Sequence, residues 1–195
     1  SLPWKDVPEW APDEFVAVLG ARLYAGARLC ALFGVPDGQA TRMVALMACD
    51  ANGTLAACRT APFCGRYRAL TPRHTQAHLF ERELWEQHGL VPDGHPWLKP
   101  VRFDRGAGPA VIDFFEVAGG EVHEVAVGPV HAGIIEPGHF RFQCNGEEVL
   151  HLEIALGFQH RGVEEALTGG PHPATMSQME TVAGDTTIAH AIAHA

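Results

Sequence analysis

The sequence has few basic residues and lacks the segments that mark membrane and exported proteins. Of its 195 residues, 14 are Lys or Arg and 23 are Asp or Glu, so the net charge is −9. This acidic balance argues against a nucleic-acid partner, which would need a basic surface. No apolar run reaches the roughly 18 residues of a membrane-spanning helix. The N-terminus, SLPWKDVPEW, lacks the charged-then-apolar order of a signal peptide. We therefore expect a soluble, cytoplasmic chain with no direct membrane span.

The sequence also has few cysteines and few histidine pairs at a spacing that could hold a metal. The five cysteines are scattered, and their odd number favours reduced thiols over disulfides. Cys58 and Cys64 are not at a zinc-ligand spacing. Only two histidine pairs, HTQAH at 74–78 and HAIAH at 190–194, have helical spacing, and neither contains the glutamate of an HExxH motif. The composition therefore predicts no resident metal.

The first half predicts a sheet flanked by helices. APDEFVAVLGARLYAG (11–26) has an apolar face at helical spacing, and acidic residues occupy its first turn. RLCALFGV, TRMVALMAC and TLAACRT predict three short strands, joined by turns at Asp37-Gly38 and Asn52-Gly53. A second helix is expected over 71–89, with Thr71 as its cap and Gly89 at its end. Its charged residues, Glu81 among them, are expected on the surface.

The second half predicts hairpins and then helices. DFFEVAGGEVHEVAVG should turn at Gly119-Gly120, and HFRFQCNGEEVLHLEIALG at Asn145-Gly146. Leu150, Leu152, Ile154 and Leu156 alternate, which predicts a strand with one buried face. A short helix is expected in HRGVEEALTG, followed by a terminal helix within 179–195. The fold class is therefore α+β, in two units separated by the turn-rich stretch 89–109.

Long phrases in the second half resemble one enzyme family. Residues 128–165, which contain GPVHAG, EPGHFRF and HRGVEE, closely resemble the start of the large subunit of membrane-bound nickel–iron hydrogenases. The resemblance is to the large subunits of hydrogenase-4 and formate hydrogenlyase, and more distantly to the D subunit of respiratory complex I. The stretch TPRHTQAHLFERELWEQHGLVPDGHPWLKPVR resembles the closing signature of the C subunit of complex I. The resemblance implies a fused C/D-like protein, with a C-like domain over 1–105 and a D-like domain over 106–195. Because such a D module continues for several hundred residues, we expect the chain to be truncated.

The resemblance also implies a function. It points to a subunit of a membrane-associated oxidoreductase of the NADH:quinone oxidoreductase or formate hydrogenlyase type, on the inner face of the cell membrane. Electron transfer and proton handling would occur beside a small iron–sulfur subunit, with membrane-arm subunits as further partners. The partner subunit would hold the iron–sulfur clusters, and quinone would bind in the full complex. This chain itself would hold no cofactor. Glu136, His131 and His139 occupy the positions that imply proton handling or a quinone-facing cleft. The alternative for each histidine is a structural role with two hydrogen bonds, and for Glu136 it is a loop carboxylate held by backbone N–H groups. Arg161 is expected to anchor loops, or the boundary with the small subunit, rather than to perform chemistry.

The nickel-ligand positions depart from the hydrogenase pattern. When the family motif is aligned on Gly184 and His190, Ala183 and Thr186 occupy the places of two cysteines. Nickel in this family is held by thiolate sulfur, which neither a methyl group nor a neutral hydroxyl replaces. The sequence therefore predicts no metal in this chain. It also leaves open a second interpretation, a non-catalytic scaffold that links iron–sulfur and membrane subunits.

Overall fold

A computed structural model describes residues 3–101, 114–129, 137–156, 158 and 161–195. The chain divides into two compact units, residues 1–104 (unit 1) and 105–195 (unit 2), and each is described by itself. Both units combine helices with antiparallel sheets, which confirms the α+β class. The identity of the two domains, C-like over 1–105 and D-like over 106–195, stays a prediction.

The centre of unit 1 is a four-stranded sheet in the order β1-β4-β3-β2. The expected three-strand meander is confirmed, because β2 pairs antiparallel with β3 and β3 with β4. Gly38 and Gly53 have φ angles of 63° and 65° in the two connecting turns, a conformation that glycine adopts readily. The short β1 adds to the edge in parallel with β4. The strands are β1 (Glu9–Trp10), β2 (Arg28–Asp37), β3 (Ala40–Cys49) and β4 (Thr54–Thr60).

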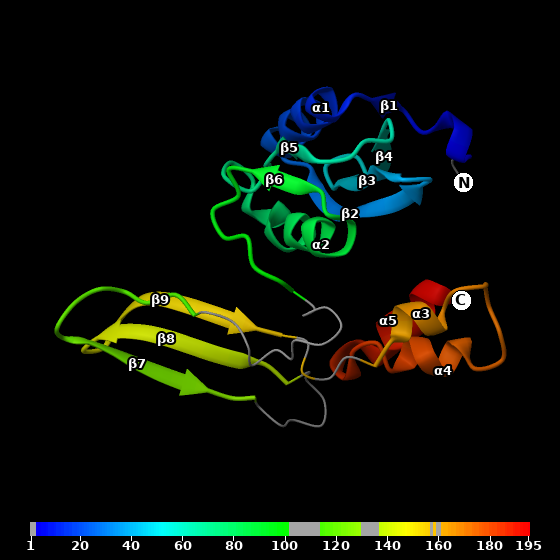
Figure 1. The fold of residues 1–195 in the computed structure, drawn as a ribbon. Helices are drawn as coiled ribbons and strands as arrows, with labels where there is room; N and C mark the ends of the chain where they lie inside the picture. Colours follow the sequence, from blue (N-terminus) through cyan, green and yellow to red (C-terminus); the bar gives the residue numbers. More distant parts are fainter. Residues whose placement is uncertain (1–2, 102–113, 130–136, 157, 159–160) are drawn as a thin grey trace. The chain divides into compact units, whose positions relative to one another are not determined.

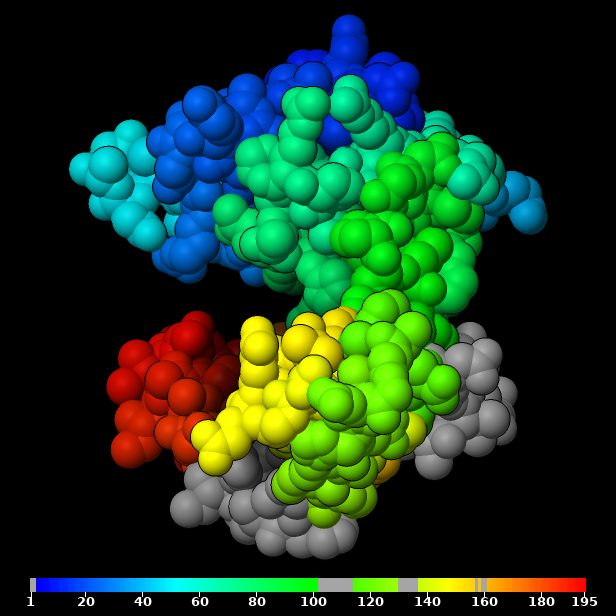
Figure 2. All heavy atoms as spheres, turned by 90° about the vertical axis from the view of Figure 1, so that its left-hand side faces the viewer, coloured from blue at the N-terminus to red at the C-terminus, as the bar shows by residue number. Residues whose placement is uncertain are grey.

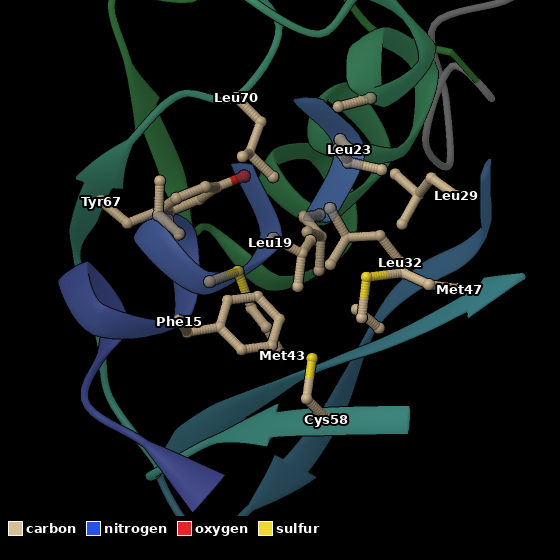
Figure 3. Packing of buried hydrophobic residues seen from close by; sticks show 14 of the residues in the cluster. Phe15, Leu19, Leu23, Leu29, Leu32, Met43, Met47, Cys58, Tyr67 and Leu70 are labelled. Carbon is tan, nitrogen blue, oxygen red and sulfur yellow. The ribbon is translucent and has the colours of Figure 1, made fainter. Parts of the chain in front are cut away.

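The core of unit 1 lies between this sheet and two helices, α1 (Pro12–Tyr24) and α2 (His78–His88). Phe15 and Leu19 of α1 are fully buried and pack against Met43 of β3 (Figure 3). Cys58 points into the same cluster as a small apolar group, and burial raises its thiol pKa to about 11. A parallel pair, β5 (Arg66–Arg68) and β6 (Val91–Asp93), and two 3-10 turns, η1 (Trp4–Asp6) and η2 (Thr75–Ala77), complete the unit.

The start of α2 differs from the expectation. The helix begins at His78 rather than near Thr71, and Thr71 is not its cap. Thr71 instead donates hydrogen bonds to Glu81 from its backbone N–H (2.9 Å) and its hydroxyl (2.6 Å). Glu81 is fully buried, so its expected surface position was wrong. The end of the helix is confirmed, because Gly89 closes it with a φ of 67°.

Unit 2 contains a three-stranded antiparallel sheet, β7 (Val122–Val127), β8 (His139–Asn145) and β9 (Glu148–Ala155) (Figure 1). The β8–β9 hairpin turns at Asn145-Gly146 as predicted. The hairpin expected at Gly119-Gly120 does not form, because residues 114–118 have no strand structure and β7 pairs with β8 instead. Phe114 and Phe115 pack on side chains of β8 and β9, which takes their segment away from the edge of β7.

The two faces of this sheet are the reverse of the expectation. Leu150, Leu152, Ile154 and Leu156 keep 41–46 % of their surface exposed, so the predicted buried face of β9 was wrong. On the opposite face Gln143 and Glu153 are only 4 % and 6 % exposed. Phe114 and Phe115 contact this polar face through His139, Arg141 and His151. The segment before β7 therefore covers the polar side of the sheet.

Short helices follow the sheet: α3 (Val163–Ala166), α4 (Thr175–Glu180), the 3-10 turn η3 (Gly184–Thr186) and α5 (Thr187–His194). The terminal helix expected within 179–195 is thus interrupted between α4 and α5. The Thr187 hydroxyl bridges the break, because it lies 2.9 Å from the Glu180 carbonyl and 3.0 Å from that of Gly184. None of the helices in the described part of the chain is long and apolar enough to cross a membrane.

Candidate functional site

Strand pairing in unit 2 brings two of the sequence motifs together at one end of the sheet, and the chain leaves the sheet toward the third motif from the same end. Val127 pairs with Phe140, so GPVHAG leaves β7 beside the point where EPGHFRF enters β8. His139 pairs with Ala155, so the chain that leads to HRGVEE leaves β9 at the same end. Segments that are separate in the sequence therefore begin or end side by side (Figure 1). The end of a sheet, where several connections begin or end, is a common place for a functional site.

Two of the three predicted site residues, His131 and Glu136, lie outside the described residues. The residues that flank them are described, and they show how closely the two motifs approach. Gly128 has a φ of +110°, and a Cβ atom there would lie 2.2 Å from the carbonyl oxygen of Gly138. No side chain fits in that space, so Gly128 is required where GPVHAG passes EPGHFRF.

The third predicted residue, His139, is the first residue of β8 and is half-buried. Its ring is tilted by 37° against Phe114, with 5.5 Å between the ring centroids. Its Nδ1 atom is buried, and it has no hydrogen-bond partner among the described residues. A structural histidine would make two hydrogen bonds, one from each ring nitrogen. Among the described residues, Nδ1 of His139 makes none. The ring is oriented by packing, and Nδ1 can carry a proton or accept one.

A charged group that the sequence analysis missed lies beside His139. The guanidinium of Arg141 stacks over Phe114 at 4.3 Å and pairs with Glu124 at 2.5 Å. The amide of Gln143 donates a 2.6 Å hydrogen bond to the other oxygen of Glu124. The polar residues at positions 141 and 143, which alternate with the phenylalanines in HFRFQ, were the available signal, because they mark a polar sheet face.

Arg161 of the third motif contacts the segment that the sequence analysis aligned with the nickel-ligand motif. Its Nη2 donates a 2.7 Å hydrogen bond to the carbonyl of Thr181, in agreement with the expected anchoring role. At Thr186, which the sequence analysis aligned with one cysteine ligand, Oγ1 lies 3.0 Å from His190 Nδ1. Ala183 offers only a methyl group at the other. This donor set does not fit nickel, and the described residues contain no cluster of three possible metal ligands.

Comparison with known proteins gives the evolutionary context. The chain is 32 % identical over 122 residues to formate hydrogenlyase subunit 5 of Escherichia coli (strain K12), which covers 51 % of this chain and 21 % of that protein. It is 27 % identical over 151 residues to hydrogenase-4 component G of the same organism, covering 66 % of this chain and 27 % of that protein. It is 28 % identical over 131 residues to the C/D subunit of NADH-quinone oxidoreductase from Photorhabdus laumondii, covering 49 % of this chain and 22 % of that protein.

The chain is a homologue of hydrogenase and NADH-quinone oxidoreductase subunits. The resemblance carried by the motifs is confirmed. No protein-family model matches the chain. The chain spans about a fifth to a quarter of the length of these relatives, so their whole activities are not transferred by the comparison alone.

Proposed function

We propose that the protein is a subunit of a membrane-associated oxidoreductase of the complex I or hydrogenase-4 type, located on the inner face of the cell membrane. The complex would be of the NADH:quinone oxidoreductase or formate hydrogenlyase type. Homology to subunits of both classes supports the subunit role. The observation that carries the proposal is that GPVHAG leaves β7 and EPGHFRF enters β8 at the same end of the β7–β9 sheet, with His139 at the start of β8.

The chain's own contribution is proton handling by Glu136, His131 and His139. An imidazole exchanges a proton near neutral pH, and the buried Nδ1 of His139 has no partner in the described part of the chain. A carboxylate such as that of Glu136 relays protons when a low-dielectric setting brings its pKa toward neutral. Arg141 is already paired with Glu124, so its charge is balanced beside His139. Iron–sulfur clusters in a neighbouring small subunit would carry the electrons, and quinone would bind in the full complex.

A scaffold role is the second candidate, and one observation favours it. Ala183 supplies no ligand, and the Thr186 hydroxyl is in hydrogen-bond contact with His190. A chain altered in this way would still join an iron–sulfur subunit to membrane-arm subunits without catalysing a reaction.

The test uses the intact complex, purified from its host through a tag on this chain. Electron transfer from NADH or formate to quinone is measured together with nickel content. The proposal expects activity with far less than one nickel per complex. Assembly with iron–sulfur and membrane subunits but without activity would support the scaffold instead. Nickel near one per protein, with hydrogen evolution, would show that Ala183 and Thr186 do not prevent nickel binding.

Single variants then test the proton-handling residues. Glu136→Gln and His139→Gln should each lower turnover by about 10²-fold while the complex still assembles, a typical effect of removing a proton-transfer group. His123→Gln is the matched control, because His123 is an exposed histidine of β7 in the same sheet. Unchanged turnover in both site variants would refute their role.

A further inference from the structure

One face of the β7–β9 sheet is an open apolar surface. The rows Val125–Phe142–Leu152 and Val127–Phe140–Ile154 lie side by side across the three strands. The surface, here called the apolar face, is defined by six side chains that each keep 41–46 % of their area exposed: Val125, Val127, Leu150, Leu152, Ile154 and Leu156. Together they expose roughly 400–500 Å², which is within the range of the largest patches on monomeric proteins, patches that are often functional. A patch of this size fits the centre of a protein interface, whose polar rim makes up the rest of roughly 800 Å² per partner.

The charge of the chain is concentrated on the same unit. Residues 105–195 contain twelve Asp and Glu against three Arg and no Lys, whereas residues 1–104 contain eleven acidic and eleven basic residues. The whole net charge of −9 therefore belongs to unit 2. Glu121, Glu147 and Glu148 are exposed at the turn end of the sheet, which faces the viewer in green to yellow in Figure 2. The apolar face is thus bordered by negative charge at this end.

We propose that the apolar face docks a partner protein that presents apolar side chains flanked by Lys and Arg. Charge complementarity selects this occupant. A second copy of the chain would bring two acidic units of the same sign together, and an anionic membrane surface would repel the glutamates in the same way. The proposal rests on the proposed subunit role, because that role supplies a protein partner.

The first experiment measures binding of three synthetic amphipathic peptides to the full chain by fluorescence anisotropy. One peptide has leucines flanked by lysines, the second has the same leucines flanked by glutamates, and the third keeps the lysines but replaces leucine with serine. The first should bind at least tenfold more tightly than either of the others. Raising the salt concentration to 0.5 M should reduce that preference over the glutamate peptide. Equal binding of the lysine and glutamate peptides would overturn the charge argument.

Variants locate the binding surface. Leu152→Thr with Ile154→Thr should weaken binding of the leucine–lysine peptide by about tenfold, because threonine keeps strand propensity but removes apolar area. Leu55→Thr is the matched control, since Leu55 is a 70 % exposed leucine on β4 of unit 1. The double variant Glu147→Gln with Glu148→Gln should weaken binding of the leucine–lysine peptide and should also make that binding less sensitive to salt. Circular dichroism confirms that each variant is folded, and equal loss in the Leu55 control would overturn the assignment to this face.

Sedimentation velocity at several concentrations tests the competing occupant. The proposal expects a monomer at low salt, because the acidic units repel each other. A dimer that Leu152→Thr with Ile154→Thr abolishes would show that a second copy covers the face and would overturn the proposal. Different results would refute the subunit role and the docking surface. A complex that does not assemble in the host refutes the subunit role, whereas an assembled complex that is indifferent to the face variants refutes only the docking surface.

Discussion

Glu81 shows that a charged residue at helical spacing can be a structural anchor. Its carboxylate accepts hydrogen bonds from the backbone N–H groups of Leu70 (2.8 Å) and Thr71 (2.9 Å), and from the Thr71 hydroxyl. These three donors compensate for the loss of water around a buried charge. Burial, and secondarily the nearby Glu81, raises the pKa of the Tyr67 phenol, which keeps that side chain neutral. The carboxylate thus ties the segment after β5 to α2.

Replacing this carboxylate by an amide should destabilise unit 1. In Glu81→Gln the side-chain NH₂ would face a backbone N–H, so one buried donor loses its acceptor. We expect a loss of about 2–4 kcal/mol in the free energy of unfolding. All four tryptophans lie within residues 1–104, so urea unfolding followed by tryptophan fluorescence reports on unit 1. Glu14→Gln, at an exposed position of α1, is the control and should change stability by less than about 0.5 kcal/mol.

The meander of unit 1 and the end of α2 were predictable because each carries its own local signal. The three strands of the meander have apolar runs separated by Asp-Gly and Asn-Gly turns, and α2 ends at a left-handed glycine. Burial was less predictable, because it depends on which segment covers an element. The alternation of Leu152 and Ile154 identifies residues that share a face, but it does not say that Phe114 and Phe115 cover the other one.

The candidate site was predictable only in part for the same reason. The motifs located His139, whereas the ion pair of Arg141 and Glu124 depends on the pairing of β7 with β8. The sequence instead suggested that the strand before Gly119-Gly120 would pair with β7. His131 and Glu136 stay predictions, since they lie outside the described residues.

The contact between the first two motifs gives a test at the level of the β7–β8 pair. Gly128→Ala would place a methyl group against the backbone of Gly138 and force alanine to a φ of +110°. We expect a local destabilisation of more than about 3 kcal/mol, because both clash and backbone strain contribute. Hydrogen–deuterium exchange should accelerate at the amides of β7 and β8. Gly120→Ala is the control, because no atom lies within 4 Å of a Cβ there. Equal protection in both variants would contradict the close approach.

The region around α2 should make the stability of unit 1 depend on pH. His78 and His95 stack with ring centroids 5.5 Å apart, and burial lowers the pKa of both imidazoles. Burial also lowers the pKa of His88, whose ring packs against Gly34. The unfolded chain therefore binds protons more readily than the folded one. The contribution of these residues to stability is full above the unfolded pKa of about 6.5 and is lost as pH falls through the lower folded values.

Urea unfolding of the full chain between pH 5 and pH 8, followed by tryptophan fluorescence, measures this dependence. His78→Phe removes one titrating group but keeps an aromatic ring beside His95, so the decrease below pH 6.5 should become smaller. His194→Phe, an exposed residue at the end of α5, should leave the decrease unchanged. A wild-type stability that rises as pH falls through this range would contradict the direction of the three pKa shifts.

At the scale of the whole molecule, the buried core described in unit 1 uses no residue from unit 2. Its members lie between Phe15 and Leu90, and the residues packed against it also belong to unit 1. About 100 residues is a normal size for an independent domain. The two units also differ in charge, since unit 1 is neutral and unit 2 carries the full −9. We therefore expect residues 1–104 to fold alone.

The fragment 1–104 should unfold in one cooperative transition, with a urea midpoint close to that of the tryptophan signal in the full chain. Both proteins contain the same four tryptophans, so the two curves are directly comparable. Limited trypsin digestion of the full chain gives an independent measurement, and it should cut first at Arg102 or Arg105 and leave a stable N-terminal fragment. Met43→Ala in both proteins is a matched perturbation of the fully buried core, expected to cost about 2–5 kcal/mol in each. A fragment without a cooperative transition, or digestion of 1–100 before the boundary is cut, would show that unit 1 depends on the remainder of the chain.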